Sequence, residues 1–110
     1  MAKVVSYDRE NDILAVHKGF SVEEKFKGNI DIGDVVLDIS TQGRVVGIEL
    51  INASTFLADF GIKKKMLESM KDASFTASVK PKSILISLAI KALGQEIPAK
   101  IAVPLEVRQR

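Results

Sequence analysis

The sequence has 110 residues, no cysteine and a formal net charge of +2, with 46% hydrophobic and 27% charged residues. A chain of this length has room for one hydrophobic core, and its composition is that of a globular protein. The lack of cysteine excludes disulfides, thiolate metal sites and cysteine nucleophiles. No run approaches the roughly 18 apolar residues of a membrane span, and the first residues show no signal peptide. We therefore expect a cytoplasmic protein with no membrane association.

The two parts of the chain carry opposite charge. Residues 1–60 hold six Lys or Arg against ten Asp or Glu, and residues 61–110 hold ten against four, which gives net charges of −4 and +6. This asymmetry indicates either an anionic partner for the basic part or attraction between copies of the chain. Because the basic residues are spaced rather than clustered, we prefer a solvated surface or self-association, and we expect a homodimer.

Five strands are predicted before residue 52. Asp8 and Asn11 favour a turn between the first two strands, because their side chains bond their own backbone. A bulge is expected at Gly28, and Gly43 can supply the positive φ of a hairpin turn. The last two strands are apolar on both faces, so we expect central strands covered on both sides. The predicted strands are residues 4–7, 12–18, 22–32, 35–40 and 44–51.

Helical signals follow residue 52. Asn52 or Ser54 is a candidate N-cap, and Gly61 is placed to end a helix in the left-handed conformation. A second short helix should follow with an apolar stripe on one side. Its stripe consists of Ile62, Met66, Leu67 and Met70.

From Ser74 onward the hydrophobic period returns to two, which predicts three more strands. Residues 83–94 also fit a capped helix, but isoleucines at strict period two favour a strand. Pro98 and Pro104 cannot donate a backbone hydrogen bond, so the last strand should lie at a sheet edge or have its proline nitrogens turned outward.

The sequence therefore predicts an α+β fold, mostly antiparallel sheet with about eight strands and one or two short helices after residue 52. We expect a single domain over residues 1–110. Its parts are a five-stranded part (1–52), short helices (53–72) and a three-stranded extension (73–110).

Two segments, SYDRENDIL and GRVVGIELINAS, resemble a known family. They are similar to the small prokaryotic proteins catalogued as domain of unknown function 2283, over about residues 4–56. The sequence departs from the family pattern at Ala15, where an aromatic residue is usual. The family has no established activity, and some members look like the smaller partner of a toxin-like gene pair, so the resemblance implies an interaction role. The matching residues, which we expect to be mostly structural, are Tyr7, Asp8, Asp12, Leu14, Gly43, Arg44, Val46, Gly47, Ile48, Glu49, Ala53 and Ser54.

Glu49 stands out because it interrupts an apolar strand. Depending on the turn register, it lies opposite Val35 or Val36. An unpaired buried charge is prohibitive, so Glu49 should lie at the rim of the sheet or be buried with hydrogen-bond partners, Tyr7 being one candidate. We expect it to be structural.

The acidic residues supply the main alternative function. Asp8, Asp12 and Glu49 are candidates for an acidic cluster in a small-ligand-binding or metal-binding enzyme. Asp8-Arg9-Glu10-Asn11-Asp12 begins like a calcium loop, but the later positions lack the required Gly and Glu. His17 is the single histidine, and no nucleophile or cofactor motif accompanies it. We therefore prefer a non-catalytic interaction or structural module without a cofactor or metal.

Nucleic-acid binding is the third hypothesis. Lys63, Lys64 and Lys65, with Lys71, are candidate contacts for phosphates or another anion. The same residues are typical of a solvated helix face, and no aromatic residues are interleaved to stack on bases. Nucleic acid is accordingly an unlikely partner.

Overall fold

The computed structural model describes residues 3–105. The first part contains five strands, β1 (Val4–Asp8), β2 (Ile13–His17), β3 (Phe26–Ile32), β4 (Val35–Ser40) and β5 (Val45–Ile51). Three short helices follow, α1 (Ala53–Leu57), the 3-10 helix η1 (Ala58–Phe60) and α2 (Lys64–Glu68). The last part contains β6 (Met70–Val79), β7 (Ser83–Ala92) and β8 (Gln95–Pro104). Eight antiparallel strands with short helices after residue 52 confirm the predicted fold class.

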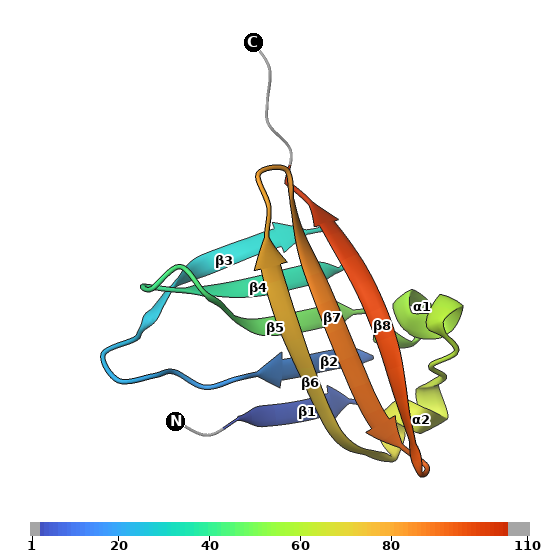
Figure 1. Ribbon diagram of the computed structural model, residues 1–110. Coiled ribbons are helices and arrows are strands. Elements are labelled where there is room, and N and C mark those ends of the chain that lie inside the picture. The colour runs from blue at the N-terminus through green and yellow to red at the C-terminus, as the bar shows by residue number, and fades with distance from the viewer. Residues whose placement is uncertain (1–2, 106–110) are drawn as a thin grey trace.

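The strands form two antiparallel sheets. Sheet A has the order β1-β2-β5-β4-β3, and sheet B has the order β6-β7-β8. In Figure 1 the strands of sheet B run across those of sheet A, and the helices lie at the end where β5 leads toward β6. This is the crossed packing of two twisted sheets.

The hydrophobic core lies between the sheets. Alternate residues of the strands point into it, as the period of two requires. The helical segment adds Leu57 of α1, Leu67 of α2 and Ile62 between η1 and α2, each at most 1% exposed. Each large aliphatic side chain buried in this way stabilises the fold by roughly 1.5–3 kcal/mol. The most deeply buried strand residues include Leu14, Leu37, Leu50, Ile84, Ile86, Leu88 and Ile90.

Several local predictions are confirmed. Residues 83–94 contain the strand β7, and β8 with its two prolines lies at the edge of sheet B. The register shifts between Phe26 and Gly28, which is the expected bulge. Gly43 and Gly61 adopt φ values of 75° and 79°, as their turn and helix-end positions require.

Two local predictions are wrong, and a third is confirmed only in part. Strand β3 begins at Phe26 rather than at Val22, because the preceding residues form a loop held by Glu24. Asn52 is the N-cap residue of α1, as expected, but its side chain makes no capping hydrogen bond. Strands β4 and β5 are central, but only one face of them lies in the core, and Val36 on the other face is half-buried.

Within residues 3–105, no helix has the length and hydrophobicity needed to cross a bilayer.

Candidate functional site

Three residues join the β1–β2 turn to the start of α1. This Asp12 cluster consists of Tyr7, Asp12 and Ser54. The Tyr7 hydroxyl donates to Asp12 Oδ1 at 2.5 Å, while the Ser54 backbone N–H donates to Oδ1 at 3.0 Å and its hydroxyl to Oδ2 at 2.7 Å. The Ala53 N–H also donates to the Asp12 carbonyl oxygen at 2.9 Å. Because the first N–H groups of a helix have no partner within it, Asp12 caps α1 from a distant segment.

The electrostatics of the Asp12 cluster favour a structural role. Burial raises the pKa of Tyr7 well above its usual range, and the hydrogen bond to Asp12 raises it further. Burial opposes ionisation of Asp12, but the hydrogen bonds from Tyr7 and Ser54 outweigh it and lower the pKa of Asp12. The ionised form of Asp12 is therefore the form that accepts the hydrogen bonds from Tyr7 and Ser54.

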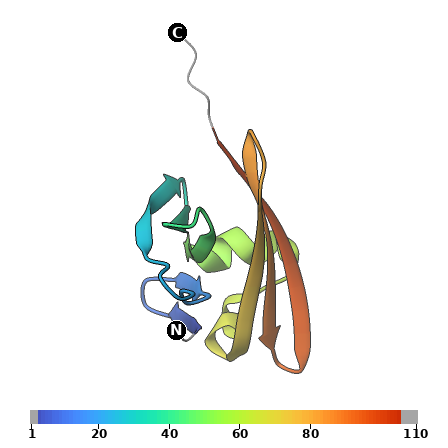
Figure 2. The same cartoon turned by 60° about the vertical axis from the view of Figure 1, so that its left-hand side comes forward.

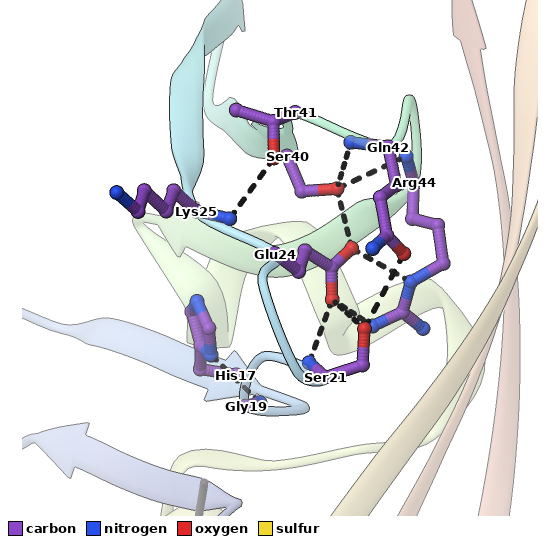
Figure 3. A network of polar contacts seen from close by, with 9 residues as sticks. All are labelled: His17, Gly19, Ser21, Glu24, Lys25, Ser40, Thr41, Gln42 and Arg44. Carbon is purple, nitrogen blue, oxygen red and sulfur yellow. Dashed lines mark hydrogen bonds and ion pairs between the residues drawn. The ribbon is translucent and has the colours of Figure 1, made fainter.

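Figure 3 shows a second group, the Glu24 cluster, which consists of Ser21, Glu24, Ser40 and Arg44. Glu24 lies in the loop before β3 and is only 5% exposed. Arg44 donates from Nε to Glu24 Oε2 at 2.8 Å and from Nη2 to Oε1 at 2.6 Å. The Ser40 hydroxyl donates to Oε2 at 2.5 Å, and the Ser21 backbone N–H donates to Oε1 at 2.9 Å. A buried charge requires such complete pairing.

This pairing also fixes the charges in the Glu24 cluster. The hydrogen bonds from Arg44, with those from Ser21 and Ser40, hold the pKa of Glu24 far below its usual range. The same contact with Glu24 raises the pKa of Arg44. Since Ser40 ends β4 and Arg44 precedes β5, the cluster ties the β4–β5 turn to the loop before β3. The motif residue Arg44 is therefore held in place by Glu24.

On the outer face of sheet A, the side chains of Asp38 and His17 lie so close to Gly47 that a larger residue would clash with them. A Cβ atom on Gly47 would lie 2.7 Å from Asp38 Oδ2 and 2.9 Å from His17 Cδ2, closer than such atoms approach in proteins. Asn29 Nδ2 donates to Asp38 Oδ1 at 2.6 Å, and His17 Nδ1 accepts the Gly19 N–H at 2.8 Å. The motif glycine leaves room for this row of polar side chains.

We call the face of sheet A that points away from the core the open face. Glu49, on the central strand β5, lies at the centre of this face. The register places Glu49 between Ala15 of β2 and Val36 of β4, with Ile51 opposite Ile13. All five residues are half-buried. Sheet B and the helices lie on the other side of sheet A (Figure 2).

The Glu49 carboxylate has no hydrogen bond or ion pair with any of residues 3–105. Tyr7, the partner expected from the sequence, donates to Asp12 instead. The register resolves the two alternatives for Glu49 in favour of Val36. Glu49 therefore differs from Asp12 and Arg44, which are held by internal contacts.

The three carboxylates of the enzyme hypothesis do not come together. Asp8 accepts hydrogen bonds from the Asn11 backbone at 3.1 Å and side chain at 2.8 Å, within its own turn. Asp12 binds Tyr7 and Ser54, and Glu49 lies on the open face. Across residues 3–105, no three His, Cys, Asp or Glu side chains are grouped as metal ligands.

The lysines of the nucleic-acid hypothesis lie at the start of α2. Lys63, Lys64 and Lys65 are all exposed, and α2 has five residues. This exposure suits a solvated surface as well as an anion contact.

Glu24 and Ser40 were missed by the sequence analysis. Glu24 stands beside Glu23 in a polar segment, which gives no indication of burial. The one available signal was Arg44, because an arginine within an apolar hairpin needs a carboxylate partner.

Comparisons with known proteins match the part of the chain that carries both clusters. The profile of the family described as protein of unknown function (DUF2283) matches residues 5–54. An uncharacterized protein of Methanocaldococcus jannaschii is 38% identical over 88 residues, which cover 79% of this chain and 69% of the relative. Only four residues precede the family match, so an alignment of 88 residues must extend well beyond Ser54. No solved structure matches the chain. The chain belongs to the DUF2283 family.

Proposed function

We propose that the chain is a non-catalytic protein-interaction module that binds its partner on the open face. One observation carries this proposal. Asp12 and Arg44 of the family motif are held by internal contacts, whereas Glu49 has no polar partner among residues 3–105 and lies among half-buried apolar side chains. An apolar patch with one central charge supplies hydrophobic contact area together with a specific electrostatic contact.

The charges of the open face define the complementary partner. Asp31 lies opposite Val36 in the same cross-strand row as Glu49, and Asp38 lies opposite Gly47 in the next row. The face is therefore acidic as well as apolar, and it suits a partner surface that is basic and apolar. Two open faces would repel each other, because like charges would meet.

The partner is a second copy or a second small protein. In a homodimer, the acidic open face of one copy would meet the basic second half of the other. A partner encoded by a toxin-like gene pair is the alternative implied by the family resemblance. Sedimentation velocity of the chain alone at micromolar concentration separates the two cases, because only the homodimer forms without a second protein. If charge attraction drives the homodimer, added salt weakens it.

The proposal is tested by charge reversal on the open face. Glu49→Lys places a cation where a basic partner is expected. Asp59→Lys is the matched charge reversal, because Asp59 is exposed on η1, on the other side of sheet A from the open face. Both variants are assayed for self-association and for co-purification with the purified product of the neighbouring gene. We expect Glu49→Lys to abolish the complex and Asp59→Lys to retain it. If the complex survives Glu49→Lys unchanged, or no complex forms with either partner, the proposal is wrong.

A further inference from the structure

A cavity of about 240 Å³ lies beside the Glu24 cluster, at the side of the molecule where β5 begins and β6 passes. It is separate from the open face, since sheet B contributes part of its wall. Two of its lining residues are cations and the others are small or apolar. The lining residues are Lys18, Gly43, Arg44, Val45, Ala77 and Val79.

The guanidinium group of Arg44 uses one edge, formed by Nε and Nη2, to bind the two oxygens of Glu24, and its other edge makes no hydrogen bond with residues 3–105. A guanidinium group has five N–H donors, so Nη1 and the second hydrogen of Nη2 remain for another acceptor. Figure 3 shows one terminal nitrogen of Arg44 pointing away from Glu24. The Arg44 side chain is 44% exposed, so this free edge is accessible.

Lys18 is held in place without a carboxylate. It is half-buried, and its Nζ lies 4.6 Å from the centre of the Phe75 ring, which is a cation–π contact. Burial, and then the charge of Arg44, lower the pKa of Lys18. Among residues 3–105, no Asp or Glu oxygen lies within ion-pair distance of its ammonium group. Lys18 and Arg44 thus line the same cavity. Among residues 3–105, Glu24 is the carboxylate that pairs with Arg44, and no carboxylate pairs with Lys18.

We propose that Lys18 and Arg44 form a binding site for one oxyanion, the phosphate or carboxylate group of a small ligand. The oxyanion accepts hydrogen bonds from the free edge of Arg44 and from the Lys18 ammonium group. Both donors are already oriented, Arg44 by Glu24 and Lys18 by Phe75, so little side-chain freedom is lost on binding. Ala77 and Val79 provide an apolar wall for the part of the ligand that carries the anion.

The test is a titration of the full chain with inorganic phosphate and, separately, with acetate, followed by amide NMR shifts of Gly43 and Val45. Potassium chloride at equal ionic strength is the reference. We expect saturable shifts at millimolar concentration with at least one oxyanion, and the tighter of the two identifies phosphate or carboxylate as the recognised group. Lys18→Met keeps the chain length over Phe75 and removes the charge. It should weaken binding at least tenfold, the scale of one charge-assisted hydrogen bond.

Lys100→Met is the matched control, because Lys100 is an exposed lysine on β8 outside the cavity. It should bind the oxyanion as the wild type does. The inference is overturned if neither oxyanion produces saturable shifts beyond those of chloride. It is also overturned if Lys18→Met and Lys100→Met bind equally.

Discussion

The carboxylate of Asp12 accepts hydrogen bonds from both the backbone N–H and the hydroxyl of Ser54, a residue 42 positions further along the chain. Asp12 closes the β1–β2 turn and Ser54 opens α1, so the contact fixes where the first sheet ends and the helices begin. The Glu24–Arg44 pair does the same for the loop before β3 and the β4–β5 turn. The family motif thus builds a scaffold from contacts between distant segments.

The Asp12–Ser54 contact should be measurable as a coupling energy. Asp12→Asn and Ser54→Ala should each lower the free energy of unfolding by about 1 kcal/mol, the usual cost of losing a helix cap. The double variant should lose less than the sum, because the hydrogen bond from the Ser54 hydroxyl to the Asp12 carboxylate requires both side chains. Urea unfolding of the four proteins gives the coupling. Strict additivity would show that the contact contributes nothing to stability.

Glu24 should make the protein sensitive to acid. The pKa of Glu24 is lowered in the folded state, chiefly by Arg44, so its contribution is present above the unfolded value of about 4.3. That contribution is lost as the pH falls through the folded value. We therefore expect the melting temperature of the wild type to fall more steeply below about pH 4 than that of Glu24→Gln. Parallel curves for the two proteins would contradict the ion pair.

Tyr7 should act in the opposite pH range. Burial and the bond to Asp12 raise its pKa in the folded state, so its contribution is present below the unfolded value of about 10 and is lost as the pH rises through the folded value. Tyr7→Phe should be less stable than the wild type at neutral pH, and the difference should shrink above about pH 10. Tyr7 is the only tyrosine, so its ionisation can be followed by ultraviolet absorbance. Ionisation near pH 10 in the folded protein would exclude the buried contact.

Gly47→Ala tests the close approach on the outer face of sheet A. The added Cβ would meet Asp38 and His17 at less than 3 Å, so one of these side chains must move. We expect a loss of about 1 kcal/mol, at the low end for overpacking, because both side chains can swing outward. Gly28→Ala is the control, since a Cβ there meets no atom within 4 Å. Equal stability of the two variants would show that Gly47 is not needed for packing.

The regular strands were predictable because their pattern is local. Strict alternation in β7 distinguished strand from helix, and two prolines placed β8 at an edge. Each of these signals depends on the residue itself or on its near neighbours.

The two clusters were not predictable in detail because each joins segments that are distant in sequence. Glu24 is buried only because Arg44, twenty residues later, neutralises it. Asp12 replaces the side-chain cap expected from Asn52, which adopts a left-handed φ of 54° instead. The apolar pattern of β4 and β5 showed that both strands are central, but the same pattern fits a face covered by the core and a face left for a partner.

Glu49 provides the most direct test of the claim that this motif residue serves the surface, whereas Asp12 serves the fold. Glu49→Gln keeps the shape of the side chain and removes its charge, and it can be compared with Asp12→Asn by urea unfolding at neutral pH. We expect Glu49→Gln to change the free energy of unfolding by less than about 0.5 kcal/mol, as at an exposed site, and Asp12→Asn to lose about 1 kcal/mol. A loss of about 1–3 kcal/mol in Glu49→Gln, the cost of disturbing a buried hydrogen-bonded group, would show that Glu49 is structural and contradict the account.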